Sequence, residues 1–386
     1  MAEIYTKIKI SLRSLGSKQK KLENTKILFL FCLVVTSLIV IFIGFLPTFT
    51  NAHSCYERDE NGNWIANRSD CVLWGWQNFV DSVIMPTGIN GVYKAFTEDS
   101  FWNIPIPPDA PIHPDSAKII AFLSADNTHE FVRLSGLGKG GTWGRPIYWG
   151  YKSGPTYQVD CARKTYDIHI PDHAKADPSS DAALTVYDMV SGHVFGLHGD
   201  PGHSMWCSSA HVLRSNGLDN KWTQFPDTHP DNTGHRGAPA SNIGIRYDEI
   251  LAGKITHKLH LSVNNSKNTH VFPLVGDENG TSDPYAPPEG ALIRIKQSVD
   301  LSKRNLSPPA MIIARALQIY GAYVGEQSGG PINIKVENTI AEGKGDLWAG
   351  VLAWDALKDI PIQDYEVIEY GYGCGSYSAC VPAEQE

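Results

Sequence analysis

Signature motifs of several common enzyme classes are missing from this chain of 386 residues. It contains no GxSxG nucleophile elbow, no HExxH motif, no EF-hand loop and no GxxxxGK[ST] phosphate loop. These absences argue against a serine hydrolase of the elbow type, a zincin, a calcium sensor and a P-loop nucleotide enzyme. No heptad or short repeat runs through the chain either, and its 42% hydrophobic residues are typical of a globular protein.

Basic residues form no extended run beyond the first 26 positions. The chain has 33 Lys and Arg against 41 Asp and Glu, which gives a net charge of −8. Binding to nucleic acid needs a clustered cationic surface, because phosphates must be neutralised. We therefore expect no nucleic-acid partner.

Long hydrophobic runs are limited to residues 27–46, which carry no charge. This length suits a helix that crosses a bilayer, either as a transmembrane anchor or as a signal sequence. The basic tail at residues 1–26 predicts a cytoplasmic N-terminus, with the bulk of the chain exported to the periplasmic or extracellular side. Cleavage after Ala52 is the alternative and would give a secreted protein. The membrane is thus an expected partner through the N-terminal helix.

Cysteine is also sparse, with seven residues, of which Cys32 lies in the hydrophobic run. The other six form an even number on the exported side, where an oxidising compartment favours disulfides. A zinc site is the alternative, but no CxxC pair accompanies these cysteines. We expect two local pairs and one long-range pair, namely Cys55–Cys71, Cys374–Cys380 and Cys161–Cys207.

The exported part is predicted to contain a cap and one large domain. Residues 53–92 are rich in Trp and hold two cysteines, which predicts a disulfide-stapled N-terminal cap. Residues 93–386 predict a mainly β domain, a β-sandwich or jelly roll with a few short helices, because short alternating runs are separated by turn signals. Strands are expected at 165–170, 183–187, 192–197, 254–263, 291–296, 323–327, 332–337 and 365–370, and helices at 116–123, 247–252, 308–320 and 347–357.

The expected strand at 254–263 has the clearest alternation in the chain. Ile255, Leu259 and Leu261 would share one face with His257, while His260 would lie on the other. This pattern predicts one face against the core and one face in water.

The segments SFWNIPIPPDAPI, RYDEILAGKITHKL and PPAMIIARALQIYGAYV resemble a family of largely uncharacterised secreted bacterial β-sandwich proteins. The similarity covers about three quarters of the exported chain. It implies an extracellular, carbohydrate-associated protein and implies no particular activity. Residues 196–235 depart from the family pattern, because this chain is unusually rich in His there.

A histidine-rich loop follows the expected strand at 192–197. His198, Asp200 and His203 lie within six positions of one another on a turn rich in Gly and Pro. Such side chains can bind a divalent metal ion, or supply a base and its orienting partner. The spacing matches no strong metal motif, so a polar loop with local hydrogen bonds is the alternative. These three residues are the leading catalytic candidates, with one divalent metal ion as the candidate cofactor.

Two further groups contain candidate catalytic residues. The first lies around a short predicted helix and consists of Arg246, Tyr247, Asp248 and Glu249, with His257 and His260 nearby in sequence. A Tyr proton donor, a His base and an Arg that neutralises an acidic sugar suit β-elimination, while paired carboxylates suit glycoside hydrolysis. Helix capping and ion pairing are the alternative for this group. The second group is on an expected strand, where Asp167 and His169 alternate and therefore lie on the same face. This face either lines a cleft or is exposed to solvent.

Aromatic residues in Gly-rich loops supply the argument for a sugar ligand. Trp143, Trp149 and Trp206 are the candidate substrate-binding residues, because flat rings on loops suit sugar rings, although Trp is also common in cores. We therefore expect an extracytoplasmic protein that cleaves a polysaccharide or cell-envelope glycan, as a lyase or a glycoside hydrolase. The alternatives are a non-catalytic glycan-binding or adhesion protein and a structural envelope protein. An enzyme should gather its catalytic groups in one groove.

Overall fold

A computed structural model describes residues 102–138, 141–161, 164–214, 217–218, 243–274 and 276–372, with two short strands, β1 (Tyr56–Arg58) and β2 (Trp64–Ala66). Contacts divide the chain into Met1–Asn51 and Ala52–Glu386, and all the described residues belong to the second unit. The predicted basic tail and transmembrane helix lie outside the described residues, as does most of the predicted cap. Within the described ranges, no helix combines the length and hydrophobicity needed to cross a membrane.

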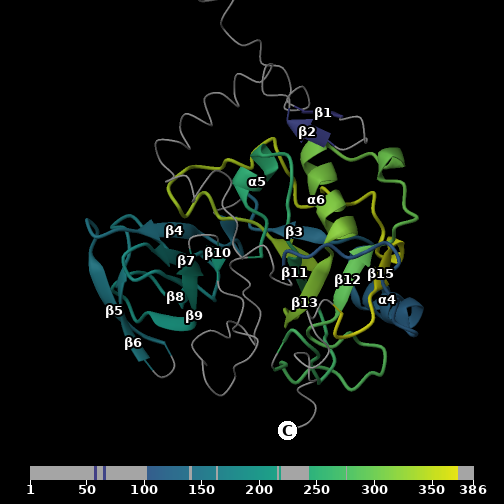
Figure 1. The fold of residues 1–386 in the computed structure, drawn as a ribbon, viewed down its shortest axis with the longest axis horizontal. Helices are drawn as coiled ribbons and strands as arrows, with labels where there is room; N and C mark the ends of the chain where they lie inside the picture. The colour runs from purple at the N-terminus through teal and green to yellow at the C-terminus, as the bar shows by residue number, and fades with distance from the viewer. Residues whose placement is uncertain are drawn as a thin grey trace, which may run out of the picture. The chain divides into compact units, whose positions relative to one another are not determined.

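The described chain is mainly β, with few short helices, as predicted (Figure 1). Two main sheets contain most of its strands. The five-stranded sheet has the order β10-β9-β8-β7-β4, and the six-stranded sheet has the order β15-β12-β13-β11-β14-β3. The first comprises β4 (Ile147–Gly150), β7 (Ala183–Asp188), β8 (His193–His198), β9 (Trp206–Arg214) and β10 (Gly217–Leu218). The second comprises β3 (Arg133–Ser135), β11 (Leu259–Val263), β12 (Leu292–Ile295), β13 (Ala322–Gln327), β14 (Asn333–Lys335) and β15 (Tyr365–Val367).

Parallel pairing occurs in both main sheets. The pairs β4–β7, β11–β13 and β14–β3 are parallel, and the strands of each pair are far apart in sequence. A separate antiparallel hairpin joins β5 (Thr156–Cys161) to β6 (Lys164–His169). Turn signals reveal hairpins such as β7–β8, but they carry no information about pairs of strands that are distant in sequence.

Local signals explain the ends of the helices α4 (Ser116–Asp126), α5 (Tyr247–Leu251) and α6 (Pro308–Ile319). In α6, the Ser307 hydroxyl accepts a hydrogen bond from the backbone N–H of Ala310, and two prolines occupy the first turn. Gly321, with a φ of 72°, follows its C-terminus. Two short 3-10 helices, η6 (Leu301–Lys303) and η7 (Ile362–Asp364), complete the described helical elements.

The predicted helix at 347–357 is wrong, because this segment forms a series of turns. Gly350 adopts a φ of 75° in the middle of the segment, a conformation that a helix cannot contain. Most hydrogen bonds around it join residues three apart, as from Val351 N to Trp348 O, and the single four-residue bond, from Leu352 N to Trp348 O, does not continue into a helical ladder.

The strand predicted at 254–263 is shorter than expected and buried on both faces. All five residues of β11 are buried, including His260, which the alternation assigned to a wet face. The physical reason is its position inside the sheet, where β13 and β14 flank it and both faces are covered. The alternation of polar and apolar residues therefore did not predict which side chains of this strand are exposed.

The predicted Cys161–Cys207 disulfide is confirmed. It joins the end of β5 to β9, with a Cα–Cα distance of 4.7 Å. The other four cysteines that were expected to pair, Cys55, Cys71, Cys374 and Cys380, lie outside the described residues. The hairpin of β5 and β6 also shares a hydrophobic cluster with β7 and β8, so the disulfide closes a packed unit.

Candidate functional site

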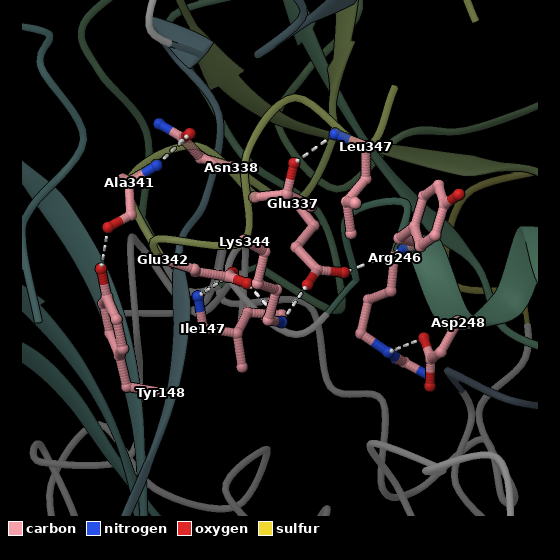
Figure 2. Close-up of polar contacts among 12 residues, drawn as sticks. Ile147, Tyr148, Arg246, Asp248, Glu337, Asn338, Ala341, Glu342, Lys344 and Leu347 are labelled. Carbon is pink, nitrogen blue, oxygen red and sulfur yellow. Dashed lines mark hydrogen bonds and ion pairs between the residues drawn. The ribbon is translucent and has the colours of Figure 1, made fainter. Parts of the chain in front are cut away.

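Three segments that are remote in sequence meet beside the six-stranded sheet. The backbone N–H of Asn338 donates to Arg145 O at 3.1 Å, and the N–H of Glu337 donates to Ile245 O at 2.8 Å. These bonds hold residues 141–148, 246–257 and 337–348 together. We call the charged side chains gathered there the buried charge cluster, which consists of Arg246, Asp248, Glu249, His257, Glu337, Glu342 and Lys344; Figure 2 shows five of them.

A pair of carboxyl groups shares one lysine at the centre of the cluster. Lys344 Nζ lies 3.0 Å from Glu337 Oε1 and 2.5 Å from Glu342 Oε2, while the two glutamate side chains are only 3% and 1% exposed (Figure 2). Burial and the negative charge of Glu337 raise the pKa of Glu342 well above its usual range. Burial alone would also raise the pKa of Glu337, but the Lys344 charge and a hydrogen bond from Glu342 lower it. These opposite shifts favour a proton on Glu342 and a negative charge on Glu337.

Both glutamates also satisfy buried backbone groups. Glu337 Oε2 accepts a hydrogen bond from the N–H of Tyr247 at 2.8 Å, which satisfies a free donor in the first turn of α5. Glu342 Oε1 accepts from the N–H of Ile147 at 2.6 Å, at the start of β4. Each carboxyl group therefore ties the 337–348 segment to one of the other two segments.

Arg246 connects the carboxyl groups at the other end of the cluster. Its Nε lies 3.0 Å from Asp248 Oδ1, and its Nη2 lies 3.3 Å from Glu249 Oε1. His257 Nε2 lies 2.9 Å from the same Glu249 oxygen, and its Nδ1 lies 2.7 Å from Lys258 O. Both ring nitrogens of His257 thus face oxygen acceptors, which fix the orientation of the ring.

Asp248 differs from the other acidic groups of the cluster, because 27% of its side chain is exposed. Its pKa is raised to about 6, mainly because burial disfavours the charged carboxylate. The positive charge of Arg246 lowers this pKa, and the negative charges of Glu249 and Glu337 raise it. In contrast, the pKa of Glu249 is lowered: burial opposes ionisation, but the Arg246 and His257 charges outweigh it. Asp248 is therefore an accessible carboxyl group that changes its charge near neutral pH.

The sequence-predicted group Arg246, Asp248 and His257 comes together in this cluster, through Glu249. Sequence reasoning missed three members, Glu337, Glu342 and Lys344. Their signal in the sequence was weak, because Glu337 ends a predicted strand, and Glu342 and Lys344 follow it in a Gly-containing loop.

The histidine loop does not form such a cluster. The His198 ring nitrogen Nδ1 lies 2.7 Å from Asp181 O, and Asp200 Oδ1 accepts a hydrogen bond from the N–H of Ala176 at 2.8 Å. Asp200 and His203 are both exposed. Across the described ranges, no three His, Cys, Asp or Glu side chains are arranged to hold a metal ion.

The other strand group is divided between two environments. His169 Nδ1 lies 3.2 Å from Asp188 Oδ2, and Asp188 is fully buried. Burial opposes ionisation of Asp188, but hydrogen bonds from the backbone of His169 and the following turn lower its pKa. Asp167 is exposed on the same strand. This His–Asp pair joins β6 to the β7–β8 turn.

The three candidate tryptophans have different surroundings. Trp206 is more than half exposed and stacks on His198, with ring centroids 4.0 Å apart. Trp149 is partly buried and stacks on Tyr187. Trp143 is exposed and lies on the 141–148 segment, which contacts the buried charge cluster.

A surface groove of about 700 Å³ lies elsewhere, beside α4 and β15. Ala117, Ile120 and Ala121 line its α4 side, and Tyr365 and Glu366 line the other. None of the sequence-predicted catalytic residues lines this groove.

Comparisons with models of protein families, with curated proteins and with solved structures find no match to this chain. The cluster offers one accessible carboxyl group, a neighbouring guanidinium and a buried proton-sharing pair. Such an arrangement can transfer a proton to or from a bound molecule, because the accessible group changes its charge near neutral pH.

Proposed function

We propose that this protein is an extracytoplasmic enzyme that cleaves a polysaccharide, with Asp248 as the group that transfers a proton. The observation that carries the proposal is the exposure of this one carboxyl group at the edge of a buried charge cluster, 3.0 Å from the Arg246 guanidinium. A pKa near 6 supports it, because a general base works best when its pKa is close to the ambient pH.

The accessible groups favour elimination over hydrolysis. Glycoside hydrolysis needs two carboxyl groups that flank the scissile bond, whereas the other carboxyl groups of the described cluster are buried and occupied by backbone or ion-pair partners. Elimination from a uronic-acid polymer needs one base. In this reaction Asp248 removes the proton from the carbon next to the uronate carboxyl group, and a carbon–carbon double bond forms as the bond to the leaving sugar oxygen breaks. The leaving oxygen takes a proton from water, and Asp248 then releases its proton to the solvent.

The same proposal includes the location of the protein outside the cytoplasm. The Cys161–Cys207 disulfide supports an oxidising compartment, where such bonds persist. The charge-free run at residues 27–46 and the basic tail before it support export with a membrane anchor. The proposal also includes a β-sandwich or jelly-roll arrangement of the two main sheets.

The test uses the full-length chain, purified in detergent with its disulfides intact, and a panel of acidic and neutral polysaccharides. Reducing ends and the absorbance of unsaturated products are followed together. We expect both signals from a uronic-acid polymer, with a rate that rises with pH through the titration of Asp248. Asp248→Asn should lower the rate by about 10²–10⁴-fold, the usual contribution of a positioned acid or base.

Asp364→Asn is the matched control, because Asp364 is also partly exposed and lies 2.5 Å from an arginine, Arg304. It should leave the rate unchanged. Reducing ends without unsaturated products would replace elimination by hydrolysis. Equal loss in both variants, or cleavage that survives Asp248→Asn, would remove Asp248 from the reaction.

A non-catalytic glycan-binding function is the second candidate. The exposed rings of Trp143 and Trp206 favour it, because exposed aromatic rings suit the flat faces of sugars. Saturable binding of a polysaccharide without any cleavage, weakened by Trp143→Ala or Trp206→Ala, would assign the protein to this class.

A further inference from the structure

Three aromatic rings cluster at the edge of the six-stranded sheet, away from the tryptophans discussed above. The rings of His129, Phe131 and Trp354 have centroids between 5.4 and 5.9 Å apart. Trp354 is 44% exposed and is among the most exposed large hydrophobic residues of the described chain. We call these rings, together with Arg133, the edge patch.

Backbone contacts fix the edge patch in place. The N–H of Leu134 in β3 donates to Trp354 O at 2.9 Å, so the turn that contains Trp354 runs along the edge strand. The amide nitrogen of Asn127 donates to His129 O at 2.5 Å and to Phe131 O at 3.3 Å. The rings therefore sit on an ordered support before any ligand arrives, which lowers the entropy cost of binding.

Arg133 adds a positive charge to this surface. Its guanidinium carbon lies 4.8 Å from the centre of the Trp354 ring. Its Nε is buried without a hydrogen-bond partner, and none of the ion pairs among the described residues includes Arg133. Asp355, the acidic residue that follows Trp354 in the turn, pairs with Lys358 at 3.5 Å. The Nη groups of this half-buried guanidinium take part in no hydrogen bond or ion pair among the described residues, so their N–H donors are suited to bind a ligand carboxylate.

We propose that the edge patch is a second binding site that holds a uronic-acid residue of a polysaccharide, with the sugar ring on Trp354 and its carboxylate on Arg133. The ring supplies apolar contact, and the guanidinium discriminates the acid from a neutral sugar. The inference rests on the proposed action on polysaccharides for its ligand class. It concerns binding by residues other than Asp248.

Binding is measured by calorimetry with oligogalacturonate and with its methyl ester, which keeps the rings but removes the charge. The full-length Asp248→Asn protein serves as the parent, so that cleavage cannot consume the ligand. The parent should bind the acid more tightly than the ester. Arg133→Gln should weaken binding of the acid about tenfold or more, as expected for a charged hydrogen bond, and leave binding of the ester unchanged.

Trp354→Ala should weaken binding of both ligands, whereas Trp354→Phe should retain part of it. Tyr151→Ala is the control, because Tyr151 is similarly exposed, at 39%, and no cation lies on its ring among the described contacts. Urea unfolding of each variant shows whether the fold persists, and Arg133→Gln decides the question if Trp354→Ala does not fold.

Equal affinity for acid and ester in the parent, or unchanged binding of the acid by Arg133→Gln, would overturn the edge-patch proposal. This failure is distinct from failure of the proposed enzyme function, which is read from cleavage by the wild-type chain. Cleavage without binding at the patch, and binding without cleavage, are separate outcomes.

Discussion

Asp248 should reduce the stability of the folded protein at neutral pH, although it lies next to an arginine. The pKa of its carboxyl group is about 6 in the folded protein, against 3.8 for an unperturbed aspartate. A group whose pKa is raised by folding contributes stability below its unfolded pKa, and this contribution is lost as the pH rises through the folded value. The wild-type protein should therefore lose stability through this group between about pH 4 and about pH 7.

The size of the loss follows from the shift. A difference of about two pKa units corresponds to about 3 kcal/mol, at roughly 1.4 kcal/mol per unit. The side chain is 27% exposed, so water offsets part of the burial, and we take about 3 kcal/mol as the upper end. Asp248→Asn removes the titration and keeps the shape. Its free energy of unfolding should match that of the wild type near pH 4 and exceed it by up to about 3 kcal/mol near pH 7.

Urea unfolding of the disulfide-intact chain, repeated at several pH values, measures this difference directly. Asp364→Asn controls for the loss of an aspartate–arginine pair outside the cluster. Parallel curves for the wild type and Asp248→Asn would refute the reasoning, and so would a variant that is less stable at neutral pH. Either result would mean that the attraction of Arg246 outweighs the burial of Asp248 and that this aspartate is an ordinary structural ion-pair residue.

Three further substitutions test local geometry, two at glycines in the segments around the buried charge cluster and one at the disulfide. Gly141→Ala would place a Cβ atom 2.1 Å from Asn338 Oδ1, at a φ of +70°, whereas Gly343→Ala would place one in open space, at a φ of +77°. In thermal or urea unfolding, the first variant should lose more than about 3 kcal/mol of stability, because it combines a clash with backbone strain. The second should lose about 1–2 kcal/mol, because it has the strain alone. Equal costs would show that no clash occurs. Cys207→Ser removes the bond to Cys161, which spans 46 residues, and should cost about 4 kcal/mol in urea unfolding by loop entropy; a cost near zero would contradict that account.

Local elements could be predicted because their signals are local. The β7–β8 hairpin follows from a Gly-containing turn in which Asp188 Oδ1 accepts hydrogen bonds from the N–H groups of Val190 and Ser191. Helix α6 follows from its prolines, its serine cap and its apolar face. The helix expected at 347–357 failed because apolar spacing alone does not reveal that Gly350 adopts a positive φ.

The candidate site could be predicted only in part, for a physical reason. Arg246 and Asp248 are close in sequence, and both lie at one short helix, so their pairing was accessible to local reasoning. Glu337 and Lys344 reach the same cluster through sheet pairing and loop contacts between segments about ninety residues away, as the hydrogen bond from Tyr247 shows. In the histidine loop, by contrast, His198 and Asp200 are close in sequence but contact separate backbone groups, at Asp181 and Ala176.

Exposure separates the carboxyl groups that hold the fold from the one that can react. Glu337 and Glu342 each satisfy a backbone N–H group and a lysine, so a ligand would have to displace contacts that hold three segments together. Asp248 has one arginine contact and an accessible side chain, and it destabilises the native state at neutral pH if its pKa is near 6. A residue retained at a cost in stability is a stronger candidate for function than one that stabilises the fold. The unfolding experiment on Asp248→Asn therefore bears on function as well as on stability, because a variant that is more stable but inactive would indicate a group kept for its reaction.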